Sequence, residues 1–343
     1  TTYSLLIMTL ATSTTITLAS HHWLLAWLGL EINTLAMIPI IAKPHSPRAT
    51  EAATKYFMIQ ALAAALILFA SIINAWQTGH WTIMNTTSAQ ATTVLTLALA
   101  MKLGLAPAHF WYPEVIQGST MTTALILSTW QKLAPLALVY MALPQLSPTI
   151  IIMIGLLSAL LGGWAGLNQT QTRKIMAFSS IAHMGWLLTA LMLNYNLATL
   201  TLVTYIIMTT TMFVTLSHTS TKALPDLATT YTQAPTLLSM TMLTLMSLGG
   251  LPPLTGFAPK WLITTELIST SLLPAATALI LASLPSLFFY IRLAYFTTLT
   301  APPSNMNNKL NWRFYPTAPK PLALALATTT LLLPLTALLY PTL

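Results

Sequence analysis

One carboxylic acid and three lysines lie well inside long apolar runs of this 343-residue sequence: Glu31, Lys102, Lys132 and Lys260. Lys132 lies 12 residues past Thr120, about 18 Å along a helix and therefore close to the middle of a bilayer. A lysine at the centre of a bilayer costs on the order of 3 kcal/mol. These positions therefore predict a functional site within a membrane.

Buried lysine and glutamate side chains suit proton transfer. Removal from water disfavours the charged form of either group, and a nearby opposite charge favours it again. A change in the distance between Glu31 and a lysine would therefore move a proton onto or off the amine. Lysine suits this role better than arginine, which stays charged at any accessible pH. We predict a proton relay through Glu31, Lys102, Lys132 and Lys260 that needs no cofactor.

A structural interpretation of these residues stays open. The lysines could extend to the membrane interface, and Glu31 could form a fixed ion pair that sets helix register. His183, in SSIAHMGWLL, is equally consistent with a satisfied core histidine and with a proton relay. His109 is a further candidate for relaying protons outward, whereas His21, His22, His45 and His80 are expected near the interfaces.

Two of the apolar runs contain helix-breaking residues beside a lysine. Residues 246–263 read MSLGGLPPLTGFAPKWLI, where Pro252 and Pro253 remove two backbone donors, so a continuous helix should break there. A second interruption is predicted at residues 100–113, AMKLGLAPAHFWYP. Carbonyls that prolines leave unbonded are tolerated in a membrane only where protein or water satisfies them.

The prolines that closely follow two of the lysines predict water beside the amines. Pro107 follows Lys102 by five residues, and Pro135 follows Lys132 by three. The freed carbonyls can hold water next to each ammonium group. We therefore expect a hydrated chain from lysine to lysine along the membrane plane.

Composition restricts the class of protein. The chain is 55% hydrophobic and only 5% charged, which is too few charges for a soluble surface, so we predict an all-α polytopic membrane protein. The 13 basic residues are scattered without an aromatic-rich basic stripe, which argues against nucleic-acid binding. The absence of cysteine excludes disulfides, thiolate metal sites and cysteine-ligated iron–sulfur clusters. No HExxH motif or Gly-rich phosphate loop is present. The first apolar run reads as a retained span and not as a cleavable signal.

Apolar runs of about 20 residues are the units that predict membrane spans. We count about 11 of them: 2–19, 23–42, 52–76, 89–106, 121–141, 148–166, 175–193, 197–217, 235–251, 273–297 and 322–340. The run at 89–106 has a short continuation from residue 108, and the run at 235–251 continues to residue 268.

The ten other lysines and arginines fall on one predicted side of the membrane. If the spans alternate, that side carries the loops or helix ends with Lys43, Arg48, Lys55, Arg173, Lys174, Lys222, Arg292, Lys309, Arg313 and Lys320. The opposite loops contain no lysine or arginine. By the positive-inside rule, the N-terminus is expected on the positive side.

Three separated motifs resemble a known family. MKLGLAPAHFWYPEVIQGS (101–119), LGGWAGLNQTQTRKIMAFSSIAHMGW (161–186) and GLPPLTGFAPKW (250–261) are similar to antiporter-like subunits of respiratory complex I. Relatives of that family occur in multisubunit cation/proton antiporters. The resemblance covers nearly the whole chain. It implies a single transmembrane domain with two inverted five-helix repeats, about 2–141 and 148–297, each with one discontinuous helix. A C-terminal helix at about 322–340 would follow, and the chain would lack the first spans of longer family members.

The resemblance also implies roles for the ionisable residues. Glu31 would pair with Lys102, Lys132 would be the middle relay, and Lys260 would lead to the exit or to a neighbouring subunit. The chain itself would hold no metal or cofactor, since flavin, iron–sulfur clusters and quinone belong to other subunits of such a complex.

The location and partners follow from the same resemblance. The positive side would be the matrix side of the mitochondrial inner membrane. The partners would be other membrane-arm subunits of complex I, accessory subunits, and phospholipid including cardiolipin.

The resulting prediction is proton translocation coupled to remote electron transfer from NADH to quinone. The chain would thus be a core subunit of an enzyme complex without a redox site of its own. Two alternatives stay open. One is a subunit of a cation/proton antiporter that exchanges sodium, and the other is a structural spacer of the membrane arm.

Overall fold

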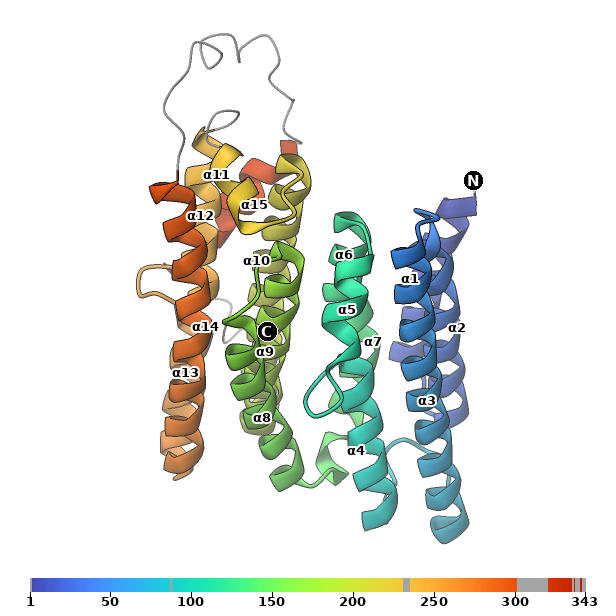
Figure 1. Ribbon diagram of the computed structural model, residues 1–343. Helices are drawn as coiled ribbons and strands as arrows, with labels where there is room; N and C mark the ends of the chain where they lie inside the picture. Colours follow the sequence, from blue (N-terminus) through green and yellow to red (C-terminus); the bar gives the residue numbers. More distant parts are fainter. Residues whose placement is uncertain are drawn as a thin grey trace. The chain divides into compact units, whose positions relative to one another are not determined.

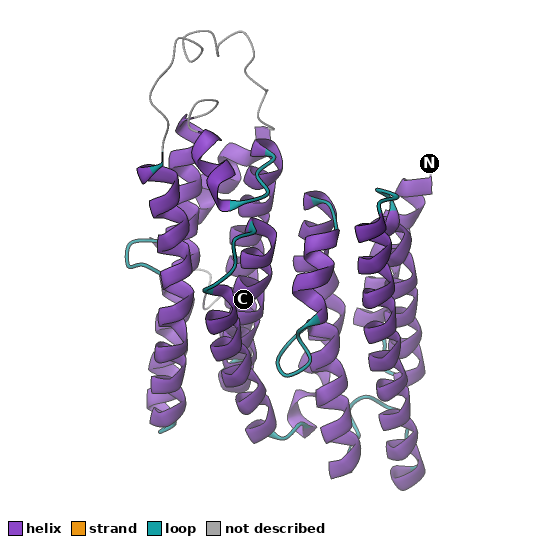
Figure 2. Ribbon diagram, viewed as in Figure 1, coloured by secondary structure: helices purple, strands orange, loops and turns teal. Residues whose placement is uncertain are grey.

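A computed structural model of the chain describes residues 2–86, 88–230, 235–300 and 320–334, together with 336 and 340. Every regular element within these residues is a helix, and no β-strand is formed among them (Figure 2). The predicted all-α class is confirmed. The chain divides into two compact units, Thr1–Ser158 and Ala159–Leu343.

The first unit contains the helices that carry Glu31, Lys102 and Lys132 (Figure 1). In chain order they are α1 (Thr2–Ala19), α2 (Trp23–Ala42), α3 (Pro47–Thr78), α4 (Ala89–Leu103), α5 (Trp111–Gly118), α6 (Met121–Ser128), the 3₁₀ turn η1 (Trp130–Lys132), α7 (Leu133–Ala142) and the 3₁₀ turn η2 (Leu143–Gln145). Helix α8 (Pro148–Gly166) crosses the boundary between the two units in the sequence.

Small residues allow close helix packing in this unit. A Cβ atom at Gly29 of α2 would lie 2.6 Å from Thr17 Cγ2 on α1. A Cβ atom at Gly118, the last residue of α5, would lie 2.7 Å from the carbonyl oxygen of Arg48 on α3. Ser46 caps the start of α3 by accepting a hydrogen bond from Ala49 N at 3.3 Å. The end of α5 therefore packs closely against α3, the longest helix of this unit.

The second unit contains the helices that carry His183 and Lys260. They are α9 (Thr172–Leu193), α10 (Tyr195–Thr219), α11 (Leu224–Thr229), α12 (Pro235–Gly249), α13 (Phe257–Ser269), α14 (Leu273–Leu299) and α15 (Lys320–Leu331). A Cβ atom at Gly162 would lie 2.7 Å from Ala182 N on α9, so the end of α8 packs closely there. Arg292 Nη1 of α14 donates to Leu167 O at 2.6 Å, just past the end of α8.

Eight of the described helices or helix combinations are long and apolar enough to cross a membrane. They are Thr2–Ala19, Trp23–Ala42, Pro47–Thr78, Met121–Gln145, Pro148–Gly166, Thr172–Leu193, Tyr195–Thr219 and Leu273–Leu299. Three shorter apolar helices, Ala89–Leu103, Pro235–Gly249 and Leu322–Leu331, coincide with the three other predicted runs. The structure thus supports a polytopic membrane protein, and the count of 11 spans stays a prediction.

Both predicted helix interruptions are present. Helix α4 ends at Leu103 and α5 begins at Trp111, while α12 ends at Gly249 and α13 begins at Phe257. The second break begins at Gly250, which adopts φ +79°, and thus starts before the two prolines that predicted it. The loop with Lys309 and Arg313 and part of the predicted C-terminal helix lie outside the described residues.

Candidate functional site

The end of α4 holds Lys102 beside the first break. Gly104 adopts φ +72°, a left-handed conformation that favours glycine, and Leu105 N donates to Ala100 O at 2.9 Å. Tyr112 of α5 packs on this glycine, since a Cβ atom there would lie 3.3 Å from Tyr112 Cβ. The turn therefore fixes Lys102 and Tyr112 relative to each other.

Lys132 lies in a local break of its own. It ends the 3₁₀ turn η1, where its backbone N donates to Thr129 O at 3.4 Å. Pro135 has no N–H and cannot bond to the carbonyl of Gln131 one turn earlier, which favours the departure from the α-helix. The side chain of Lys132 is only 4% exposed. The burial predicted for this lysine is thus observed.

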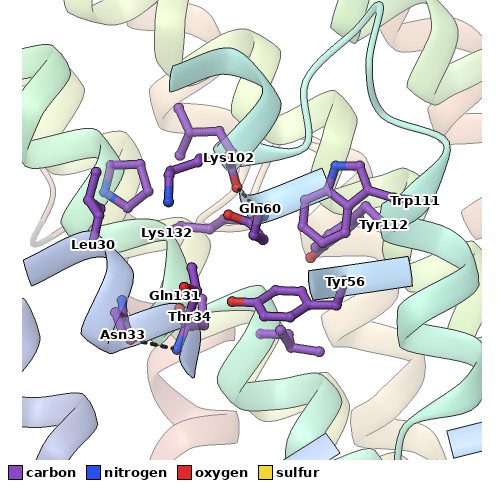
Figure 3. A pocket seen from close by; sticks show the side chains of 13 residues that line it. Leu30, Asn33, Thr34, Tyr56, Gln60, Lys102, Trp111, Tyr112, Gln131 and Lys132 are labelled. Atoms are coloured by element: carbon purple, nitrogen blue, oxygen red, sulfur yellow. Dashed lines mark hydrogen bonds between the residues drawn. The ribbon is translucent and has the colours of Figure 1, made fainter. Parts of the chain in front are cut away.

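A small cavity joins Lys102 and Lys132 within the first unit (Figure 3). The space open to water centres is about 20 Å³, which is enough for about one water molecule. The cavity is lined by Leu30, Asn33, Thr34, Tyr56, Gln60, Lys102, Leu103, Trp111, Tyr112, Leu127, Gln131, Lys132 and Pro135. No carboxylate is among these lining residues, so the cavity carries two amines and otherwise neutral groups.

Neutral hydrogen bonds brace the cavity walls. Gln131 Nε2 donates to Asn33 Oδ1 at 2.9 Å and thereby links η1 to α2. Gln60 Nε2 of α3 donates to the backbone oxygen of Lys102 at 3.5 Å. Trp111 Nε1 donates to Met101 O at 3.3 Å. The backbone around Lys102 is therefore held by side chains from α3 and α5.

Tyr112 also faces the second lysine. Lys132 Nζ lies 4.9 Å from the centroid of the Tyr112 ring, within the range of a cation–π interaction. Such a contact favours the charged form of the amine. Tyr112 is thus placed between the α4 break and Lys132.

Glu31 on α2 lies close to this cavity but is not among its lining residues. Its α2 neighbours Leu30 and Thr34 line the cavity together with Lys102. The family resemblance implies a direct pair between Glu31 and Lys102. The described part of the chain has two ion pairs under 4.0 Å, and both involve Lys55, so this direct pair is not formed. Glu31 Oε2 and Lys102 Nζ are each buried without a hydrogen-bond partner among the described protein groups. Buried polar atoms are rarely left unbonded, so water is the expected partner of each.

Lys260 occupies a different position relative to its break. It lies on α13, after the break, and its Nζ reaches back to donate to Gly249 O at the end of α12, at 2.9 Å. The amine is partly buried and lies 6.0 Å from the ring centroid of Trp186 on α9. Lys260 therefore caps the first half of its interrupted span.

The two breaks share one local hydrogen-bond pattern. Each first half-helix ends before a glycine with positive φ, Gly104 or Gly250. The residue after that glycine donates back five residues, from Leu251 N to Met246 O at 3.3 Å in the second break, as from Leu105 in the first. This correspondence is local to each unit and places a lysine amine near the end of each first half-helix.

The two candidate histidines are not part of the cavity lining. His109 is buried and stacks on Phe110 with ring centroids 4.4 Å apart. His183 lies on α9 in the second unit, with its ring centroid 6.0 Å from that of Tyr205. Their roles as relays stay predictions.

Sequence reasoning missed the neutral partners of the cavity, namely Asn33, Tyr56, Gln60, Tyr112 and Gln131. The available signal was the presence of amide side chains inside apolar runs, since such groups commonly bond across helices in a membrane. No group of three or more His, Cys, Asp or Glu residues that could hold a metal ion occurs in the described ranges.

Comparison with known families covers almost the whole chain. The family described as NADH:quinone oxidoreductase/Mrp antiporter, TM, matches residues 20–285. The family described as NADH dehydrogenase subunit 2 C-terminus matches residues 287–340.

Individual relatives agree with these matches. NADH-ubiquinone oxidoreductase chain 2 of Struthio camelus is 55% identical over 89% of this chain and 88% of its own length. The Xenopus laevis protein of that name is 50% identical over 98% of both chains. A chain of respiratory complex I from Thermus thermophilus has a TM-score of 0.87 and 27% identity over 99% of this chain and 79% of its own. A chain of the Mrp complex from Dietzia sp. DQ12-45-1b shares the fold, with a TM-score of 0.84 at 17% identity over 98% of this chain and 75% of its own.

Proposed function

The chain belongs to the NADH:quinone oxidoreductase and Mrp antiporter family of transmembrane subunits, among relatives named NADH-ubiquinone oxidoreductase chain 2, and we propose that its buried polar groups translocate protons. It acts as a membrane-arm subunit of NADH:ubiquinone oxidoreductase, complex I. Glu31, Lys102, Lys132 and Lys260 carry the relay, and His109 and His183 are its further members.

The observation that carries this proposal is the cavity shared by Lys102 and Lys132. Two amines line one water-sized space, and both are buried, at 6% and 4% exposed. Burial makes it costly to keep both amines charged at once. A proton that enters from one side therefore favours release from the other, through water between them.

The energy comes from outside this chain. We propose that electron transfer from NADH to quinone in other subunits reaches the chain as an electrostatic or conformational change near Glu31. Transfer of one proton against about 150 mV takes roughly 3.5 kcal/mol, scaled from 2.3 kcal/mol per 100 mV. Moving a charge by a few ångströms near another, at an effective dielectric of about 20, changes the energy by a comparable amount.

The finer architecture is part of the same proposal. Eleven spans would form two inverted repeats and a C-terminal helix, with the N-terminus in the mitochondrial matrix. The shared hydrogen-bond pattern of the breaks at Gly104 and Gly250 supports the repeat relation. The partners would be other membrane-arm subunits, accessory subunits and phospholipid including cardiolipin, while flavin, iron–sulfur clusters and quinone are held elsewhere in the complex.

The composition of the cavity favours protons over sodium as the transported ion. A sodium site needs several oxygen ligands, usually with a carboxylate to balance the charge. The described cavity lining contains two lysines and no carboxylate, so a second cation would be repelled. Sodium-independent pumping by the purified complex is the expected result.

Replacing Lys132 tests the proposal. Lys132→Met removes the amine at similar length, and Lys132→Arg keeps a positive charge that cannot be released at accessible pH. In liposomes with the assembled complex, both variants are expected to lower proton translocation, while the exposed control Lys43→Met leaves it unchanged. Normal coupled pumping by an assembled Lys132→Met complex would favour a structural spacer instead.

A further inference from the structure

Tyr56 is a buried phenol of α3 to which the relay described above gives no role. It lines the cavity together with Lys102 and Lys132, and it is 2% exposed (Figure 3). Its hydroxyl makes no hydrogen bond to another protein group within the described ranges. A buried hydroxyl is normally bonded, so the partner expected for this one is water in the cavity.

The position of the phenol is fixed by its neighbours. The Tyr56 ring meets the Trp111 ring edge-on, with centroids 5.8 Å apart. Trp111 is in turn bonded through Nε1 to Met101 O, one residue before Lys102. The hydroxyl therefore has a defined placement relative to the end of α4.

The relay lacks a group between Glu31 and the cavity. Glu31 does not line the cavity and forms no ion pair under 4.0 Å with Lys102 among the described residues. Leu30 and Thr34, which lie on either side of Glu31 on α2, nevertheless line the cavity, so Glu31 belongs to the helix segment that forms its wall. A proton that leaves Glu31 must therefore pass through an intermediate hydroxyl or water before it reaches Lys102.

Other hydroxyls of the cavity are less suited to this step. Thr34 also lines the cavity, but its Oγ1 donates to the backbone oxygen of Glu31 at 2.8 Å, so its proton is already engaged. Tyr112 also lines the cavity, but its ring lies against Lys132, with the amine 4.9 Å from the ring centroid, which places this phenol on the Lys132 side. Tyr56 is the other phenol of the cavity, and it lines the same space as Leu30 and Thr34, the α2 residues on either side of Glu31.

We propose that the Tyr56 hydroxyl is the proton-relay group between Glu31 and the cavity of Lys102 and Lys132. This inference rests on the proposed function. In each step the phenol gives its proton to cavity water as it accepts one from the carboxyl side. One O–H bond breaks while another forms, the phenol is neutral before and after, and no group is oxidised or reduced.

Tyr56→Phe is the variant that tests this role, because it keeps the ring against Trp111 and removes only the oxygen. Tyr140→Phe on α7 is the matched control, since Tyr140 belongs to the same unit but does not line the cavity. Both variants are assembled into the whole complex and reconstituted in liposomes. The readouts are the number of protons moved per NADH oxidised and the solvent deuterium isotope effect on the rate of proton translocation. A merely structural change would not alter the isotope effect.

Removal of one proton-transfer group typically slows a reaction by on the order of 10²-fold or more. Because cavity water can partly bypass the missing hydroxyl, Tyr56→Phe is expected to lower coupled proton translocation by about tenfold or more. Tyr56→His restores a group that can pass a proton and is expected to translocate faster than Tyr56→Phe. The assignment is overturned if Tyr56→Phe and the control Tyr140→Phe lose proton translocation equally. It is also overturned if Tyr56→Phe shows wild-type translocation and a wild-type isotope effect.

Lys132→Met measured in parallel separates this inference from the proposed function. If Lys132→Met is impaired while Tyr56→Phe pumps normally, only the role of Tyr56 fails. If both variants pump normally, the proposed function fails with it.

Discussion

Two glycines that follow helices of the first unit allow the cavity geometry to be tested separately from backbone strain. Gly104 and Gly79 adopt nearly the same left-handed conformation, with φ +72° and +74°. Substitution by alanine costs roughly 1–2 kcal/mol in that region at either position. At Gly79 the added Cβ would meet nothing within 4 Å, so the cost ends there.

At Gly104 the same atom would reach the cavity wall. It would lie 3.3 Å from Cβ and Cγ of Tyr112 and 3.4 Å from Cδ2, so this ring must shift by a few tenths of an ångström. Tyr112 lines the cavity and faces Lys132 at 4.9 Å. Since a misplacement of about 1 Å can cost on the order of 10²-fold in rate, a shift of this size predicts roughly fivefold slower translocation.

The assay compares Gly104→Ala and Gly79→Ala in the assembled, reconstituted complex. Thermal unfolding reports the backbone strain that the two substitutions share. Proton uptake per NADH oxidised reports the effect of the displaced cavity wall on translocation. Both variants are expected to lose similar stability, while only Gly104→Ala slows translocation. Equal translocation in the two variants would refute the link between the α4 turn and the cavity.

Four further substitutions probe the second unit and the surface. Gly256→Ala would place a Cβ 1.8 Å from a carbonyl oxygen of α12, so little assembled complex is expected on native gels. Gly249→Ala is the control, since its added Cβ would have its nearest contact at 3.7 Å, and it is expected to assemble normally. Lys260→Met removes the 2.9 Å hydrogen bond to the end of α12 and is expected to cost about 1–3 kcal/mol, measured as a lower unfolding temperature; an unchanged temperature would argue against the capping role. Glu114→Gln breaks only the exposed 2.7 Å ion pair with Lys55, so translocation is expected to stay at the wild-type level.

Much of the fold was accessible from sequence because membrane spans are dominated by local hydropathy. The eight long helices follow apolar runs, and both breaks lie where glycine and proline interrupt such runs. The burial of Lys102 and Lys132 was likewise predictable, since both lie deep within their runs. These features depend on residues that are near each other in the chain.

The cavity itself was not predictable in detail because its walls come from distant segments. Asn33, Tyr56 and Gln131 are brought together only when α2, α3 and η1 pack. The reach of Lys260 back to Gly249 depends on the loop geometry of its break, which apolar periodicity does not specify. The separation between Glu31 and Lys102 depends likewise on helix packing, and the implied direct pair is not among the ion pairs of the described residues.

The central claim is that Lys102 and Lys132 act on one proton path through their shared cavity. It is tested most directly by proton translocation in Lys102→Met, Lys132→Met and the double variant of the assembled complex. Groups that act as a unit are strongly non-additive, so the double variant is expected to be no slower than the slower single variant. Losses that multiply in the double variant, or normal translocation in either single variant, would contradict the account.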